Sequence, residues 1–144
     1  MTHQLDIMRG ILEQVRALDV TTVERTVTLG YYLHNFYSAM EDLFEEIAST
    51  FENRIESTTA YHRELVRRMA IEVPTIRPRV LSAASATLVD ELRAFRHVFR
   101  HSYGYSLEAE RVSSLRQKLL SGWDTVEQDL LRFENFLREQ LQAE

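Results

Sequence analysis

The chain has 144 residues, of which 44% are hydrophobic and 27% charged, a size and balance that suit one globular domain over residues 1–144. It has no cysteine, which excludes disulfides, thiolate zinc sites and cysteine nucleophiles, and its 4 glycines and 2 prolines are too few for a turn-rich fold. The formal net charge of −5 excludes a surface that coats nucleic acid uniformly, so any nucleic-acid contact must come from a local patch.

The N-terminal segment and the hydropathy pattern predict a cytoplasmic protein. Charges at Asp6, Arg9, Glu13 and Arg16 interrupt the first helix-like stretch, which therefore lacks the apolar core of a signal peptide. No run of about eighteen apolar residues occurs, so we expect no membrane-spanning segment.

Two helices are predicted in the first third of the chain. A short helix begins near Leu5 and ends near Asp19, and a long helix follows to about Arg54, with Thr21 and Glu24 as a capping box at its start. The apolar stripe of the short helix is Leu5, Met8, Leu12 and Val15. That of the long helix is Leu33, Phe36, Met40, Leu43, Ile47 and Phe51, and neighbouring tyrosines widen it.

Three further helices follow. One is expected within residues 57–73, then a proline-containing loop over 74–82, then a helix over 82–103 that Gly104 ends. The last helix begins near Glu108 and continues to the C-terminus, with the stripe Val112, Leu115, Leu119, Trp123, Val126, Leu130, Phe133, Leu137 and Leu141. Together the elements predict an all-α fold, an antiparallel up-down bundle of four main helices plus a short N-terminal helix.

Residues 93–101 gather three arginines and two histidines, and no acidic residue occurs between Leu92 and Leu107. On a helical wheel, Leu88, Leu92, Phe95 and Phe99 form a core stripe. The adjoining arc holds Arg93, Arg96, His97, Arg100, His101 and Tyr103. Such an arc indicates either a phosphate-binding or catalytic surface, or only an exposed basic face that complements the helix dipole.

Arginine and histidine together suit RNA cleavage. The guanidinium matches phosphate oxygens and stabilises the negative charge of a transition state, and the imidazole transfers a proton at neutral pH. Such a site can activate a ribose 2′-hydroxyl without a metal, which cuts RNA and spares DNA. Arg96 and His101 lie about 140° apart on the wheel, so a two-fold homodimer is expected to bring Arg96, His101 and Tyr103 of both chains into one cleft.

The stretch "RHVFRHSY" is similar to a known family. Arg96, His101 and Tyr103 match the R-x4-H-x-Y motif of the HEPN superfamily, and the chain specifically resembles the HepT-like ribonuclease toxins over roughly residues 28–120. This resemblance implies a dimeric helical bundle with a metal-independent, cofactor-free endoribonuclease site at the dimer cleft. It implies that Arg96 binds the phosphate and that His101 serves as acid or base, with support from His97 and from the neighbouring Arg100 and Tyr103.

The resemblance also implies a partner. HepT-like toxins pair with a minimal nucleotidyltransferase antitoxin, which is thought to silence the toxin by attaching AMP to the motif tyrosine, here Tyr103. The chain has no nucleotidyltransferase motif, so the transferase must be a separate protein. A bulky anionic nucleotide on Tyr103 would occupy the site of the RNA phosphate.

The sequence leaves other interpretations open beside the nuclease. One is a non-catalytic HEPN-like domain that binds RNA, a nucleotide or a partner protein, and another is a purely structural helical adaptor. A di-metal carboxylate site needs Glu-x-x-His pairs, which no histidine here provides, and Val98 replaces the glutamate that would make His97 and His101 a metalloprotease pair.

The remaining conspicuous side chains are predicted to be structural. His34 is expected to be a core histidine, with contact to the motif helix as the alternative, and Trp123 belongs to the apolar repeat. Tyr31, Tyr32 and Tyr37 are expected to pack inside the bundle rather than to stack on RNA bases.

Overall fold

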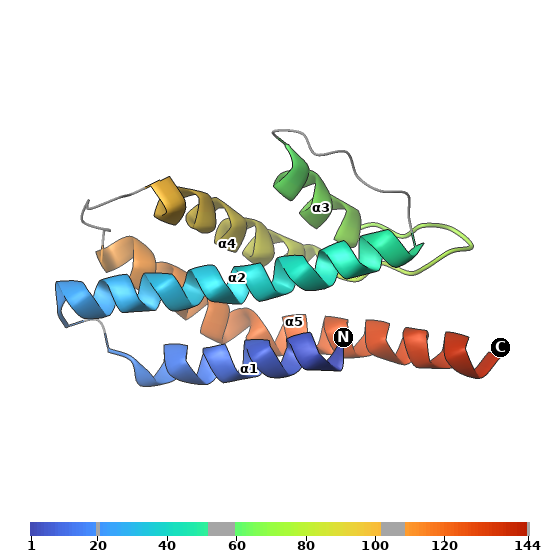
Figure 1. Ribbon diagram of the computed structural model, residues 1–144, viewed down its shortest axis with the longest axis horizontal. Coiled ribbons are helices and arrows are strands. Elements are labelled where there is room, and N and C mark those ends of the chain that lie inside the picture. The colour runs from blue at the N-terminus through green and yellow to red at the C-terminus, as the bar shows by residue number, and fades with distance from the viewer. Residues whose placement is uncertain (20, 52–59, 102–108, 144) are drawn as a thin grey trace.

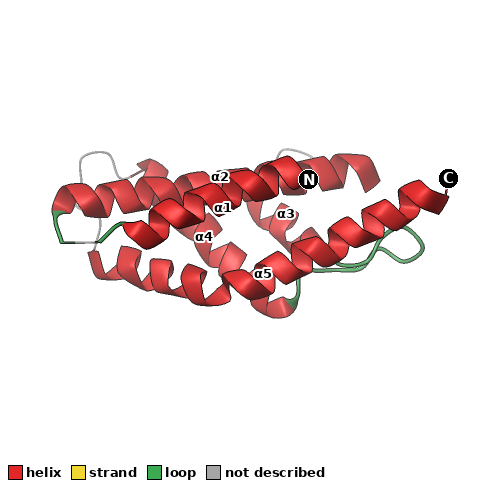
Figure 2. Cartoon of the chain, turned by 90° about the horizontal axis from the view of Figure 1, so that it is seen from below, coloured by secondary structure: helices red, strands yellow, loops and turns green. Residues whose placement is uncertain are grey.

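A computed structural model of the chain describes residues 1–19, 21–51, 60–101 and 109–143, without the side chains of residues 100 and 101. The helices are α1 (Thr2–Ala17), α2 (Val23–Phe51), α3 (Tyr61–Met69), α4 (Ala83–His101) and α5 (Ala109–Ala143). Helix α2 runs antiparallel to α1 and α4, and α4 runs antiparallel to α5 (Figures 1 and 2). The predicted all-α up-down bundle is confirmed. None of the described helices has the length and apolarity needed to cross a membrane.

The predicted core stripes of α1, α2 and α5 are buried, except at the C-terminal ends of α2 and α5. The stripe of α1 is buried, as is that of α2 as far as Ile47, and that of α5 is buried from Val112 to Phe133. Phe51 and Leu137 are partly buried at the edge of this core, while Leu141 is 72% exposed. Leu141 is exposed because the last turns of α5 extend past the ends of α1 and α2 (Figure 1).

The start of α2 differs from the predicted capping box. The hydroxyl of Thr22, not Thr21, accepts a hydrogen bond from the backbone N–H of Arg25 at 3.2 Å. Thr21 instead donates its hydroxyl to Asp19 at 2.8 Å, and Arg25 pairs with the same carboxylate. Because Asp19 holds Thr21 outside the helix, the cap falls one residue later than predicted.

Helix α3 ends at Met69, before the predicted end at Val73, and a buried arginine binds the backbone near this end. The guanidinium of Arg77 donates to the carbonyl oxygens of Arg68 and Ile71, each at 3.0 Å, and to that of Pro78 at 2.9 Å. Of these carbonyls only that of Arg68 belongs to α3, and the carbonyl oxygen of Met69 accepts from the backbone N–H groups of Val80 and Leu81, each at 2.9 Å. These donors from the following loop replace bonds that another helical turn would make, so α3 ends at Met69.

The beginning of α4 is attached to α5. Asp129 of α5, only 4% exposed, accepts hydrogen bonds from the backbone N–H of Ser82 at 2.8 Å and from the hydroxyls of Ser82 at 2.7 Å and Ser85 at 2.6 Å. A negative charge at a helix N-terminus is favourable. The predicted helix end at Gly104 lies outside the described residues, and α4 is described as far as His101.

Candidate functional site

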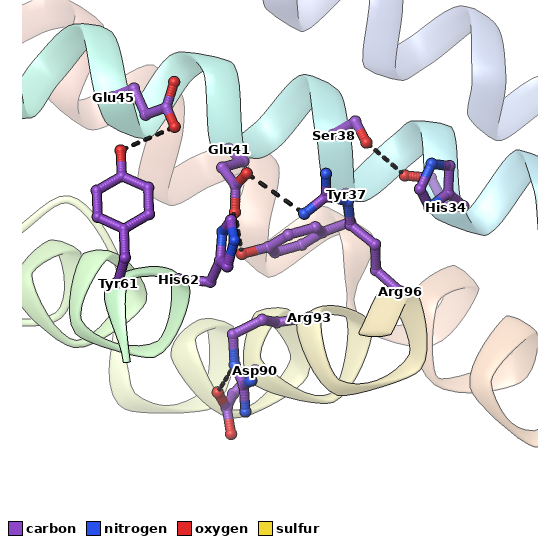
Figure 3. Close-up of polar contacts among 10 residues, drawn as sticks. All are labelled: His34, Tyr37, Ser38, Glu41, Glu45, Tyr61, His62, Asp90, Arg93 and Arg96. Carbon is purple, nitrogen blue, oxygen red and sulfur yellow. Dashed lines mark hydrogen bonds and ion pairs between the residues drawn. The ribbon is translucent and has the colours of Figure 1, made fainter. Parts of the chain in front are cut away.

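The motif arginine, Arg96, faces α2 rather than open solvent (Figure 3). Its Nη1 lies 3.5 Å from Oε1 of Glu41, and its guanidinium carbon lies 5.8 Å from the centre of the Tyr37 ring. The side chain is 18% exposed, so it is largely covered but not sealed. Arg96 is therefore restrained on two sides by residues of α2, by charge from Glu41 and by a cation–π contact with Tyr37.

Glu41 joins three helices at this point (Figure 3). It is only 6% exposed, and its Oε2 accepts a hydrogen bond from the Tyr37 hydroxyl at 2.9 Å and lies 2.7 Å from Nδ1 of His62. His62 belongs to α3, Arg96 to α4, and Glu41 and Tyr37 to α2. A buried carboxylate is strongly unfavourable without such partners, so each of these contacts stabilises it.

Tyr37 keeps its proton in this environment. Burial raises the pKa of Tyr37 far above its ordinary range, and the negative charge of Glu41 acts in the same direction, while Arg93 and Arg96 oppose it. The hydroxyl therefore remains a donor to Glu41 at any pH near neutrality.

The basic run of α4, residues 93–101, meets acidic groups that lie outside the run, one on the same helix and one on α2. Arg93 donates from Nε to Asp90 Oδ1 at 2.7 Å, one turn earlier on the same helix, and Arg96 meets Glu41 of α2. The expectation of an arc free of acidic residues therefore holds for the sequence but not for the folded helix, at least for these two arginines.

Of the other predicted site residues, His97 lies exposed on α4. His34, predicted to be a core histidine with contact to the motif helix as the alternative, is half-buried and has its ring centre 5.5 Å from that of Phe99, so it contacts the motif helix. The side chains of Arg100 and His101 lie outside the described atoms, and Tyr103 lies outside the described residues. That His101 and Tyr103 share a cleft with Arg96 remains a prediction.

The three tyrosines of α2 behave differently from one another. Tyr37 is fully buried, as predicted, and Tyr32 packs partly buried against the core. Tyr31 is 53% exposed, so the prediction that it packs inside the bundle is wrong. It shares an exposed face of α2 with Val23 and Val27, four and eight residues earlier, where no described helix covers it.

Sequence reasoning missed Glu41 and His62. One signal was present for Glu41, because it stands between the buried Met40 and Leu43 and four residues after Tyr37, on the apolar side of α2. An acidic residue on a buried helix face needs a partner. His62 gave no comparable signal, because its contact depends on how α3 packs against α2.

In the described part of the chain, no group of three or more histidine, aspartate or glutamate side chains is placed to hold a metal ion. Arg96, Glu41, Tyr37 and His62 form the Arg96 cluster, which combines a guanidinium, a carboxylate, a phenol and an imidazole. Its guanidinium is a group that can bind an anion, and the carboxylate opposes that binding.

A family model described as HepT-like protein matches residues 28–137, which include the whole Arg96 cluster. The chain belongs to the HepT-like family. Comparisons with curated proteins and with solved structures gave no match. The family membership agrees with the resemblance seen at Arg96, His101 and Tyr103, and it places this HepT-like chain in the HEPN superfamily.

Proposed function

We propose that this HepT-like chain is the toxin of a toxin–antitoxin pair and acts as a metal-independent endoribonuclease. The observation that supports this function best is the position of Arg96, the first residue of the R-x4-H-x-Y motif. Its guanidinium is held in place by Glu41 and Tyr37, yet it remains partly accessible. A restrained, accessible arginine is preorganised to bind a phosphate, which is what cleavage of a sugar-phosphate linkage requires.

In the proposed reaction, Arg96 binds the non-bridging oxygens of the scissile phosphate. His97 and Arg100 support it by adding polar and positive groups to the same region of α4. As the attacking oxygen approaches phosphorus, the phosphate gains negative charge, and the guanidinium stabilises this charge more strongly than it stabilises the ground state.

His101 moves the protons in this reaction. One imidazole accepts the proton of the ribose 2′-hydroxyl as the 2′-oxygen bonds to phosphorus, and the bond to the 5′-oxygen breaks. A protonated imidazole donates a proton to that 5′-oxygen, so the products are a 2′,3′-cyclic phosphate and a 5′-hydroxyl end. We propose that two copies of the chain form a homodimer in which His101 of each copy takes one of these roles.

The cleavage assay compares the wild type with His101→Ala on a single-stranded RNA. We expect the substitution to slow cleavage by about 10²- to 10⁴-fold, the usual contribution of general acid–base catalysis. The same RNA with 2′-deoxyribose at the cleaved linkage should resist the wild type, and a chelator should leave the rate unchanged. Equal cleavage by both proteins would overturn the assignment of His101 and indicate a contaminating nuclease.

We propose that a nucleotidyltransferase antitoxin silences the toxin by AMPylation of Tyr103. The attached phosphate would bring negative charge close to Arg96 and compete with RNA for it. When the antitoxin is coexpressed, the wild type should gain an AMP-sized mass increment and lose cleavage, whereas Tyr103→Phe should gain no mass. If Tyr103→Phe is modified to the same extent as the wild type, Tyr103 is not the modified residue.

One observation favours a second candidate function. The contact with Glu41 partly neutralises Arg96, which suits a HEPN-like domain that binds RNA, a nucleotide or a partner protein without catalysis. Such a protein would bind the RNA of the cleavage assay and leave it intact in the unmodified state, so the same experiment separates the two functions.

A further inference from the structure

We infer that Glu41 is a positioning residue for Arg96: its carboxylate, fixed by α2 and α3, sets the direction in which the motif guanidinium meets an RNA phosphate. This inference rests on the proposed function, since it assigns a role to the surroundings of the same site. Glu41 itself is covered by protein, and it acts through Arg96 rather than by touching the RNA.

The carboxylate of Glu41 is fixed before it meets Arg96. Its Oε2 is held from two directions, by the Tyr37 hydroxyl at 2.9 Å and by Nδ1 of His62 at 2.7 Å. These two bonds determine how the carboxylate plane is turned, and they leave Oε1 directed toward α4 and Arg96 (Figure 3). The position of the guanidinium therefore depends on two other helices.

Tyr37 restrains both partners of the ion pair. Its hydroxyl bonds to Glu41, while the face of its ring lies under the guanidinium of Arg96. A long, flexible arginine side chain loses less freedom on binding a phosphate when it is already held in one orientation.

Arg96 is left with binding capacity. One terminal nitrogen, Nη1, contacts Glu41 at 3.5 Å, a long contact, while Nε is buried without a hydrogen-bond partner among the described residues, so the capacity to bind a phosphate lies in the terminal nitrogens. Because the side chain is still 18% exposed, other N–H groups of the guanidinium can bind a phosphate without breaking the contact with Glu41.

Glu45 offers a matched control on the same helix. It lies one turn after Glu41 and likewise bonds to α3, accepting from the Tyr61 hydroxyl at 2.8 Å. Among the described contacts, Glu45 meets no arginine of α4. The two glutamates therefore share the attachment of α3 to α2 and differ in their contact with Arg96.

The test compares Glu41→Gln, Glu45→Gln and the wild type by steady-state RNA cleavage. Glu41→Gln keeps the size of the side chain, and we expect kcat to fall about 10- to 100-fold because the guanidinium loses its orientation. KM should not rise, because the substitution removes the negative charge next to Arg96 and so leaves the attraction between Arg96 and the RNA phosphate undiminished. Glu45→Gln should match the wild type in both constants. If Glu41→Gln also matches the wild type, or if KM rises while kcat is unchanged, the inference is wrong.

One further measurement keeps the inference separate from the proposed function, and a second covers the case in which Glu41→Gln fails to fold. The first is the NMR resonance of the Arg96 Nε–H, which should show slow hydrogen exchange in the wild type and in Glu45→Gln, and fast exchange in Glu41→Gln. This readout decides the role of Glu41 even if the wild type cuts no RNA, a result that would remove the proposed function alone. The second is Tyr37→Phe, which keeps the ring but removes one of the two bonds to Oε2 of Glu41. If Glu41→Gln fails to fold, Tyr37→Phe takes its place, and we expect it to lower kcat as well. An unchanged kcat in Tyr37→Phe would overturn the inference.

Discussion

Arg96→Ala is expected to reduce RNA cleavage by about 10³- to 10⁵-fold, the range in which single arginines contribute to phosphoryl transfer. The loss should appear mainly in kcat, because the guanidinium binds the developing charge on the phosphate more strongly in the transition state than in the ground state. Single-turnover cleavage of a labelled RNA measures it directly. Arg96→Lys should retain only part of the activity, because a lysine ammonium keeps the charge but cannot form the paired hydrogen bonds of a guanidinium.

The ion pair with Glu41 supplies a control for this experiment. Removing Arg96 leaves the buried Glu41 carboxylate without its cation, so Arg96→Ala should also lower the melting temperature. The double variant Arg96→Ala/Glu41→Gln removes that unpaired charge, and it should recover stability without recovering cleavage. If the double variant regained activity, the defect of Arg96→Ala would be one of folding. Cleavage by folded Arg96→Ala within tenfold of the wild type would contradict the proposed chemistry.

The helices and most of the core followed from the sequence because burial imposes a simple period. Leu33, Phe36 and Met40 recur at three and four residues, so they line one side of α2, and the same rule holds for α5 as far as Phe133. The rule fails at Leu141, which continues the period but lies beyond the neighbouring helices. Periodicity shows which side of a helix is apolar, and it does not show how far the partner helix extends.

Helix ends were predicted less well, because polar groups compete for the free backbone groups at these positions. Thr21 and Thr22 are both good capping residues, and the choice between them depends on Asp19 and Arg25. The end of α3 depends on Arg77, which arrives from a later loop. Such contacts become visible only when the surrounding segments have been placed.

The motif arginine was predicted from the sequence, but the residues that hold it in place were not. Arg96 could be chosen from local spacing, but its partner Glu41 lies 55 positions away in sequence, on another helix. His62 is brought to Glu41 only by the packing of α3 on α2. A stretch without acidic residues therefore does not imply an environment without acidic residues, because neighbouring helices provide the missing charge.

Two carboxylates from neighbouring helices fix α4, one near each end of its described length. Asp129 of α5 holds Ser82 and Ser85 at the start of α4, and Glu41 of α2 holds Arg96 near the motif. Fixing the first turn sets where α4 begins along the bundle, and the buried Leu92 and Phe95 set its rotation. The direction of Arg96 thus depends on contacts along the whole helix as well as on its immediate partners.

Asp129→Ala is expected to lower the free energy of unfolding by about 3 kcal/mol, because it removes the three hydrogen bonds that the start of α4 donates to a buried charge and leaves the backbone N–H of Ser82 and the hydroxyl of Ser85 without this acceptor. Urea denaturation at pH 7 measures this change. Asp124→Ala, an exposed position on the same helix, is the matched control and should change stability by less than about 0.5 kcal/mol. An equal effect of the two substitutions would show that Asp129 does not anchor α4.

The stabilising effect of Asp129 should disappear in acid. Burial alone would raise the pKa of Asp129, but hydrogen bonds from Ser85 and Ser82, with the charge of Arg132, outweigh it and hold the pKa below its ordinary value. A carboxyl whose pKa is lower in the folded than in the unfolded state contributes stability that is complete above the unfolded value, about 4 for aspartate. That contribution is lost as the pH falls through the folded value. The difference in unfolding free energy between wild type and Asp129→Ala should therefore be constant from pH 7 to about pH 5 and shrink below about pH 4. A difference that grew in acid would contradict the role of Asp129 in holding the start of α4.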